Sequence, residues 1–366
     1  MADVNFAGVS KTMGGRQVLF DIDLSIPSGT LTAIVGPSGS GKTTLLRMIC
    51  GLERPDAGVV TVAGEHVGAT GRAPQGVAMV FQEDALYEHL DVGSNLRFPL
   101  QIHGAALPHV EEKSRSVARR VGVTGLWARR PKTLSGGERG MVAAARAISR
   151  DGLRVLLLDE PLSGADRHVR QRFRRELRRL HDEEGVTTVL ATKDQEEAMA
   201  VADVLAVVME GRMAQVGSPR SVFESPQTTA VASFVGVRSM NLFPGVFELD
   251  DRRPVVSVGG DRIALDRAPE GIDDRTRVLV GLHAHELVVS PPGTPFGRTF
   301  HVSVSRVEDL GSSINLLFGL GRSPAGTFVM TENRPAAARP GDRLELTWAP
   351  GRIRLFRADT GRAIPM

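Results

Sequence analysis

The sequence contains very little cysteine and no long apolar run, and each shortage excludes a class of protein. A single cysteine, Cys50, among 366 residues excludes an internal disulfide and suits a reducing compartment. No apolar run approaches the ~20 residues that a membrane-spanning helix needs. The first ten residues, "MADVNFAGVS", have neither the basic nor the apolar region of a secretory signal. Any membrane role is therefore expected to depend on a partner.

Lysine is also scarce, and the net charge is small. The formal charge of +3 is too low to indicate a nucleic-acid-binding protein. Apart from five lysines, every basic residue other than histidine is arginine. A lysine in this chain is therefore the rarer basic choice. The lysines are Lys11, Lys42, Lys113, Lys132 and Lys193.

The chain divides into two halves of different character. Up to about residue 236, apolar β-rich runs such as "LTAIVG", "VLLLDE" and "TTVLAT" alternate with helical patterns, which predicts a parallel sheet covered by helices. Strand signals are missing between about 88 and 150, which predicts a helical insertion. Residues 237–366 contain short alternating strands with glycine and proline turns, which predicts an all-β, barrel-like domain.

The stretch "GPSGSGKT" (36–43) matches the phosphate-binding loop pattern G-x-x-x-x-G-K-[ST] and lies between a predicted strand and a predicted helix. Backbone amides of such a loop and the helix N-terminus favour phosphate. Lys42 is expected to reach the β- and γ-phosphates of a nucleotide, and the Thr43 hydroxyl to bind Mg²⁺. A chance match is disfavoured because the strand and the helix are both in the required places.

Two further motifs carry chemistry. In "VLLLDEP" (155–161), Asp159 and Glu160 end an apolar strand, where they are suited to holding Mg²⁺ and polarising water. Read alone, the pair would also fit an acidic helix cap followed by a proline that starts the helix. About twenty residues upstream, "LSGGE" (134–138) opens a helix and forms a second candidate anion site. A chain with one phosphate-binding loop uses this second anion site only if it contributes that site to the nucleotide of another subunit.

These motifs, together with "MVFQEDALYEHL" and "VLLLDEPLSGAD", occur in the order and spacing of an ABC-transporter ATPase subunit, which residues 3 to about 235 resemble almost continuously. The second half resembles the TOBE domain, an OB-like regulatory barrel. The resemblance implies an α/β P-loop ATPase (an ABC cassette with a helical subdomain) in residues 1–236, followed by an all-β TOBE-like domain in residues 237–366. This combination is similar to importers of sugars and glycerol 3-phosphate.

The resemblance also implies roles for individual residues, with ATP and Mg²⁺ as cofactors. Glu160, Gln82 and Lys193 are expected at the catalytic centre, and Gln82 also at the metal with Thr43 and Asp159. Tyr87 is expected to line a cleft for a membrane subunit, although a packing role is nearly as well supported. The nucleotide is expected to contact Met13, Val18, Ser38, Gly39, Ser40, Gly41, Lys42, Thr43 and Thr44. The partner's ATP is expected to meet Ser135, Gly136, Gly137 and Glu138, with Ser163 and Asp166 in the loop between the sites.

The sequence departs from the family pattern at three positions. Met13 occupies the place of an aromatic that stacks on adenine, and Ala165 the place of a larger apolar residue. Lys193, in "TKD", replaces the histidine that faces the γ-phosphate in the family. A lysine keeps a donor and adds a fixed charge on a flexible stem. It should hold ATP well but position water poorly, and an ion pair with Glu160 would make that carboxylate a weaker base.

Two other features have simpler explanations than a new site. The arginine-rich stretch 167–185 has an apolar stripe of Val169, Phe173, Leu177 and Leu180, so its arginines are read as a solvated helix face. The stretch "HAHE" (283–286) is expected to place two histidines on one face of a strand, but no third metal ligand lies nearby in the sequence.

The predicted function is that of the ATP-binding and hydrolysing subunit of an ABC importer, which energises uptake of a sugar or related solute through separate membrane subunits. The expected partners are a second ABC ATPase subunit (like or unlike), the permease subunits and, indirectly, an extracytoplasmic solute-binding protein. The expected place is the cytoplasmic face of the cell membrane. An alternative is an ATP-gated subunit that hydrolyses poorly because of Lys193 and pairs with an unlike ATPase subunit. A soluble ABC protein of repair or translation is disfavoured because the chain has one cassette.

Overall fold

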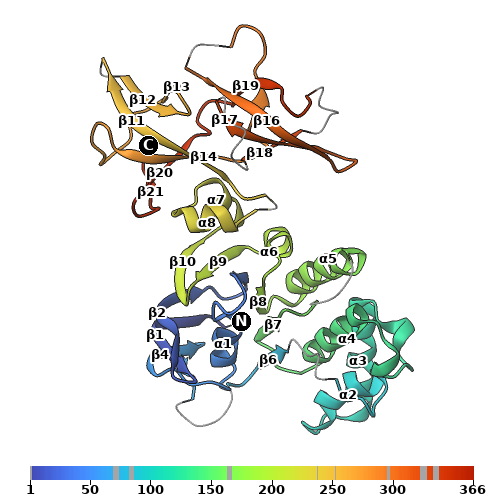
Figure 1. Ribbon diagram of the computed structural model, residues 1–366. Helices are drawn as coiled ribbons and strands as arrows, with labels where there is room; N and C mark the ends of the chain where they lie inside the picture. Colours follow the sequence, from blue (N-terminus) through green and yellow to red (C-terminus); the bar gives the residue numbers. More distant parts are fainter. Residues whose placement is uncertain are drawn as a thin grey trace. The chain divides into compact units, whose positions relative to one another are not determined.

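The computed structural model describes residues 2–68, 74–81, 86–162, 167–236, 238–251, 253–294, 297–321, 328–332 and 338–366. Contacts between Cα atoms divide the chain into two units, Met1–Arg220 and Ser221–Met366 (Figure 1). Each unit has its own sheets and its own hydrophobic core.

The first unit is built on a six-stranded sheet. Its strands are β3 (Leu31–Val35), β6 (Val77–Val80), β7 (Val155–Asp159), β8 (Thr187–Thr192), β9 (Val204–Met209) and β10 (Arg212–Gly217). Their order is β10-β9-β3-β8-β7-β6, and all neighbours run parallel except β10 and β9. Every residue of β3, β7 and β8 is buried, as expected for parallel strands covered on both faces. The predicted parallel sheet is confirmed.

A second, antiparallel sheet covers one side of the nucleotide-loop helix α1 (Lys42–Ile49). Its strands are β1 (Val4–Met13), β2 (Arg16–Ile26), β4 (Ala57–Val62) and β5 (Glu65–His66), in the order β2-β1-β4-β5. Phe6 and Ile22 of this sheet, Leu45 of α1 and Ile34 of β3 belong to one buried cluster. The helix is therefore packed between two sheets, which fixes the direction of the loop before it.

The predicted helical insertion is confirmed: between β6 and β7, the described residues form helices and the loops that join them, without a strand. These are α2 (Val92–Gln101), α3 (Leu107–Val121), η1 (Thr124–Leu126), η2 (Pro131–Thr133) and α4 (Gly136–Ile148). Asp91 begins α2 by accepting a 2.7 Å hydrogen bond from the Ser94 amide. Buried residues of α2, α3 and α4 share a core with β6, β7 and the helix that follows β7. In Figure 1 the three long helices lie together beside the β6 edge of the sheet.

Two more helices, α5 (Arg167–Glu184) and α6 (Gln195–Val201), follow β7 and β8. Phe173, Leu177 and Leu180 are buried and Val169 packs against the same cluster, so the predicted apolar stripe of α5 is confirmed. Its arginines form a network of ion pairs with acidic residues of the first unit.

The second unit contains two antiparallel sheets, as predicted for an OB-like barrel. Their orders are β13-β12-β11-β14-β20-β21 and β15-β19-β16-β17-β18. Phe243, Phe300 and Phe318 pack in the shared core. The strands are β11 (Asn241–Asp250), β12 (Arg253–Val258), β13 (Asp261–Ala264), β14 (Arg277–Leu282), β15 (Val288–Val289), β16 (Thr299–Asp309), β17 (Ile314–Leu320), β18 (Phe328–Glu332), β19 (Arg343–Thr347), β20 (Arg354–Arg357) and β21 (Ala363–Ile364).

The contact boundary after Arg220 lies earlier in the chain than the predicted boundary at residue 236. The difference arises from α7 (Pro219–Glu224) and α8 (Thr229–Phe234). In α8, the Thr229 amide donates to the Gly361 carbonyl at 2.8 Å, and Ala232 packs with Met240 and Phe356. Helix α8 therefore packs on the β-sheets of the second unit, which its sequence alone did not reveal.

The stretch "HAHE" was expected on a strand, and this prediction is wrong. Strand β14 ends at Leu282, and residues 283–286 form a turn. His283 is buried, donates through Nε2–H to the Phe223 carbonyl at 3.1 Å, and stacks on the Phe223 ring. Within the described residues, no group of three potential metal ligands is present.

Candidate functional site

The phosphate-binding loop lies between buried β3 and α1, at the carboxyl edge of the parallel sheet. Gly41 has a φ of +102°, and a Cβ there would lie 2.4 Å from Leu19 Cδ2, so only glycine fits. Ser38 and Gly39 are exposed at the loop surface. Ser40 is 4% exposed, and its hydroxyl has no hydrogen-bond partner within the described residues. A buried polar atom without a partner in this loop fits a site that is completed by a ligand.

Lys42 folds back over this loop. Its Nζ donates to the carbonyl oxygens of Gly36 and Pro37, both at 2.9 Å. Burial lowers the pKa of this ammonium, while the nearby carboxylates of Glu160 and Asp159 act in the opposite direction. Lys42 therefore lies near Asp159 and Glu160 at the end of β7, and its contact with nucleotide phosphates stays a prediction.

Thr43 and Asp159 form the candidate metal site. The Thr43 hydroxyl donates to Asp159 Oδ1 at 3.0 Å, joining α1 to the end of β7. Burial raises the pKa of Asp159, and the Thr43 hydrogen bond partly offsets this shift. A hydroxyl and a carboxylate side by side at the phosphate loop are the hard oxygen ligands that suit Mg²⁺. The residues present therefore fit the predicted ion.

Glu160 has an uncommon backbone conformation. Its φ is +43°, in the left-handed region, and its amide donates to the Ala191 carbonyl of β8 at 2.8 Å. Such a conformation is costly for a residue other than glycine and occurs preferentially at functional sites. Its carboxylate oxygen Oε2 lies 3.3 Å from Lys193 Nζ. The ion pair anticipated from the sequence is present.

The strand end that carries Lys193 is held from both sides. Thr192 donates its hydroxyl hydrogen to Glu197 Oε2 at 2.7 Å, and its oxygen accepts from the Asp194 amide at 3.0 Å. Asp194 begins α6 by accepting from the Glu197 amide, and its other oxygen pairs with Arg170 of α5 at 3.1 Å. Burial raises the pKa of the Glu197 carboxyl. Sequence reading missed this support, because no motif links Arg170 to residue 194.

The segment predicted to contact the partner's ATP, residues 135–138, forms the start of α4. Ser135 and Glu138 form a capping box, in which the Ser135 amide donates to Glu138 Oε2 at 2.8 Å. Gly136 has open space around it, whereas a Cβ at Gly137 would lie 2.0 Å from Val169 Cγ1. Within the described residues, no hydrogen bond or ion pair joins this segment to the phosphate loop of the same chain. Contact with a second subunit's nucleotide stays a prediction.

Three further residues predicted to contact the nucleotide lie around the start of α1. The Thr44 hydroxyl approaches the Met13 sulfur at 3.8 Å, and Met13 is 39% exposed at the end of β1. Val18 is half-buried and packs against the core around α1. These positions leave a soft, accessible sulfur beside the phosphate loop. The role of these residues in binding the nucleotide stays a prediction.

Gln82, Ser163 and Asp166 lie outside the described residues, as does Ala165. Tyr87 is described and shows both anticipated features: its ring packs on Phe98 with centroids 4.5 Å apart, yet 37% of the residue is exposed. The Arg146 guanidinium lies 5.2 Å from the Tyr87 ring centroid.

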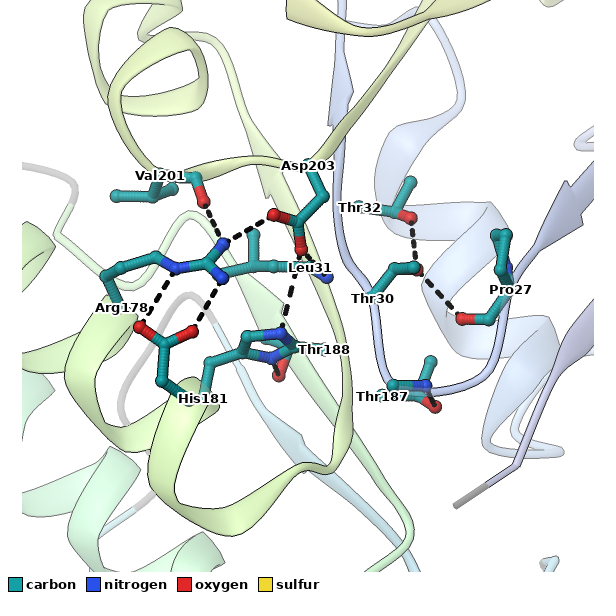
Figure 2. A network of polar contacts seen from close by, with 12 residues as sticks. Pro27, Thr30, Leu31, Thr32, Arg178, His181, Thr187, Thr188, Val201 and Asp203 are labelled. Atoms are coloured by element: carbon teal, nitrogen blue, oxygen red, sulfur yellow. Dashed lines mark hydrogen bonds and ion pairs between the residues drawn. The ribbon is translucent and has the colours of Figure 1, made fainter.

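A polar network that sequence reading missed lies at the opposite edge of the sheet, where β3, β8 and β9 begin. Figure 2 shows Asp203 between Arg178, His181 and the start of β3. Asp203 accepts from the Leu31 amide at 2.9 Å and from Arg178 at 2.7 Å, and lies 3.7 Å from His181 Nε2. The His181 ring also contacts the Thr188 hydroxyl at 3.1 Å. A lone aspartate before an apolar strand carries no sequence pattern that marks it.

The sequence model of the family described as "ABC transporter" matches residues 19–163. The chain is 36% identical over 364 residues to the sn-glycerol-3-phosphate import ATP-binding protein UgpC 1 of Rhizobium johnstonii, covering 100% of this chain and 96% of the relative. It is 37% identical over 368 residues to UgpC 2 of Agrobacterium fabrum, with 100% and 95% covered.

The fold also has solved counterparts. The dimeric post-hydrolysis structure of the ATP-binding cassette MJ0796 bound to ADP and Pi is 25% identical, with a TM-score of 0.53. It covers 59% of this chain and 98% of that chain. Among the described residues, no helix combines the length and the apolar character that crossing a membrane requires.

Proposed function

The chain belongs to the ABC transporter family as the ATP-binding subunit of an importer, and from this premise we propose that it energises uptake of sn-glycerol 3-phosphate or a related sugar solute. The solute class rests on the names of its full-length relatives. The observation that carries the ATPase role is the meeting of Lys42, Asp159 and Glu160 at one edge of the sheet.

The residues of the site divide the work of hydrolysis among them. Lys42 binds the terminal phosphates, and the loop amides and the α1 N-terminus share their charge. Thr43 and Asp159 hold Mg²⁺, with Gln82 proposed as a further ligand. When bound by these residues, the ion would supply positive charge against the charge that develops on the phosphoryl oxygens during transfer. Glu160 orients the attacking water and accepts its proton.

The partners follow from the same reading. A second ABC ATPase subunit supplies the segment Ser135–Glu138 to complete each nucleotide site, in keeping with the dimeric ABC cassette of similar fold. Membrane permease subunits receive the resulting motion, so the chain works at the cytoplasmic face of the membrane. The second unit serves as a TOBE-like regulatory domain, supported by its two antiparallel sheets around one core. The hydrolysis-poor alternative gains no support from the relatives.

The first test compares two lysine variants of the purified chain. Lys42→Ala removes the buried phosphate-facing cation, and affinity for a fluorescent ATP analogue should fall by roughly a hundredfold because a charge-assisted contact is lost. The matched control is Lys132→Ala, at an exposed lysine of the helical insertion, which should bind as the unchanged chain does. Equal affinity in both variants would contradict the site.

The second test concerns the solute. Cells that carry only Lys42→Ala should lose uptake of radiolabelled sn-glycerol 3-phosphate, whereas cells with Lys132→Ala retain it. If these cells instead lose uptake of a labelled sugar, the transported solute is a sugar and not sn-glycerol 3-phosphate. Unchanged uptake of both compounds would contradict the transport role.

A further inference from the structure

A cavity of about 520 Å³ lies where β6 and β7 begin, beside the end of α2. Its volume falls in the range of small-molecule sites, which is roughly 300–1,000 Å³. Strands β3, β8, β7 and β6 run parallel, so the cavity lies at the edge of the sheet opposite the phosphate loop. It is therefore separate from the nucleotide site.

Part of the cavity lining is apolar and buried. Leu100 is 1% exposed and Val77 is 8% exposed, and Pro99 beside Leu100 is also buried. Leu153, which precedes β7, lines the cavity as well. An apolar group that enters the cavity would lose contact with water, which favours binding.

The backbone around the cavity is held by close contacts. Gly76 has a φ of +74°, and a Cβ there would lie 2.5 Å from the Gly152 carbonyl oxygen, so this approach requires glycine. The Gly76 carbonyl accepts from the amides of Arg154 and Val155, at 2.7 and 3.0 Å. The backbone that carries the lining is therefore in place before a ligand binds, which lowers the entropic cost of binding.

Two half-buried arginines of the lining meet at the start of β6. Arg150 Nη1 donates to the Val77 carbonyl at 3.3 Å, and Cγ and Cδ of Arg154 lie 2.9 Å from where a Cβ of Gly76 would be. The two side chains thus contact consecutive residues. Within the part of the chain that the structure describes, neither guanidinium pairs with a carboxylate, whereas the half-buried Arg174 does.

One acidic residue, Asp151, also lines the cavity, but it has cationic partners of its own. Its Oδ1 lies 3.5 Å from Lys113 Nζ, and its Oδ2 lies 2.9 Å from His109 Nε2. The positive charges of Arg150 and Arg154 are therefore not compensated within the lining. Two guanidinium groups match a phosphate monoester, which carries about −1.5 to −2 charges at pH 7 and accepts paired hydrogen bonds.

We infer that this cavity binds an organic phosphate monoester. The phosphate lies between Arg150 and Arg154, and the apolar part of the molecule lies against Leu100 and Pro99. The ligand contacts both the helical insertion, through α2, and the sheet, through β6. The site uses no residue assigned to the nucleotide, so the inference goes beyond the proposed function and does not depend on it.

Phenyl phosphate is a suitable probe, because it joins a phosphate to an apolar ring. The full chain is saturated with Mg-ADP, which blocks the phosphate loop, and is then titrated with the probe by isothermal titration calorimetry. One molecule should bind per chain. Inorganic phosphate and benzyl alcohol should each bind at least roughly tenfold more weakly, because each lacks one of the two kinds of contact.

Variants of Arg154 test the role of the guanidinium. Arg154→Met keeps an unbranched stem against Gly76 but removes the charge, and affinity for phenyl phosphate should fall roughly tenfold. Arg154→Lys should lose less, since it keeps the charge without the paired donors. The matched control is Arg175→Met, at an exposed arginine of α5, which should bind the probe as the unchanged chain does. Equal ADP affinity in all variants shows that each is folded.

Phenylglyoxal, which modifies arginine side chains, locates the bound probe. Phenyl phosphate should slow the modification of Arg150 and Arg154, followed by mass spectrometry, and leave that of Arg175 unchanged. The inference is overturned if the ADP-loaded chain shows no saturable binding, or if Arg154→Met binds the probe as tightly as the unchanged chain. Inorganic phosphate binding as tightly as phenyl phosphate would also overturn it, because the apolar lining would then contribute nothing.

Discussion

Asp203 should be a determinant of stability in the first unit, and the network of Figure 2 allows its contribution to be worked out. The Leu31 amide is fully buried and donates to Asp203 at 2.9 Å. Asp203→Ala leaves this donor without an acceptor, which costs about 1–3 kcal/mol. The Arg178–Asp203 ion pair adds only about 0–1 kcal/mol, because both side chains are more than a third exposed. A loss of about 2–3 kcal/mol in the free energy of unfolding is expected.

Asp203→Asn separates the two contributions. Its amide oxygen can still accept from Leu31 while the charge is lost, so the expected cost falls to about 1 kcal/mol. The matched control is Asp151→Ala, which removes an exposed carboxylate paired with His109 and Lys113 and should change stability by less than about 0.5 kcal/mol.

The assay is urea unfolding of the full chain followed by the fluorescence of Trp127, in the first unit, with Trp348 of the second unit replaced by phenylalanine in every variant. ATP-analogue affinity should stay unchanged, because the network lies at the sheet edge opposite the phosphate loop. If Asp203→Ala unfolds at the same urea concentration as Asp151→Ala, or if the alanine and asparagine variants are equally unstable, the reasoning about the Leu31 amide is refuted.

Three further predictions concern dimerisation with ATP, the pH dependence of stability and the boundary between the two units. Glu160→Gln with Mg-ATP should sediment as a dimer, because each nucleotide site is completed by the segment Ser135–Glu138 of a second subunit. A monomer at saturating ATP would exclude self-pairing. Burial lowers the pKa of His181 below its usual 6.5, so the unfolded chain binds more protons. Urea stability should therefore fall as pH drops below about 6.5, and His181→Gln should flatten this fall. A chain ending at Arg220 should fold and bind ATP, whereas one ending at Val235 keeps α7 and α8 without their sheets and should aggregate more in light scattering.

Much of the nucleotide site could be predicted from the sequence because its determinants are local. Glycines around Lys42 set the loop between a strand and a helix, and their spacing alone identifies it. The Ser135–Glu138 capping box likewise lies within four residues of the chain. The apolar stripe of α5 and the all-β character of the second half follow from periodicity, which reports burial without any knowledge of partners.

Only the tertiary structure decided which of these parts meet. Thr43 and Asp159 are 116 residues apart in sequence, and their hydrogen bond depends on the strand order β3-β8-β7. The same order places Lys193 against Glu160, whose left-handed backbone no local pattern announces. Asp203 acquires its importance from an amide 172 residues away. Side-chain pairing at the edges of a parallel sheet is set by strand order and register, and these depend on packing of the whole core rather than on any short stretch of sequence.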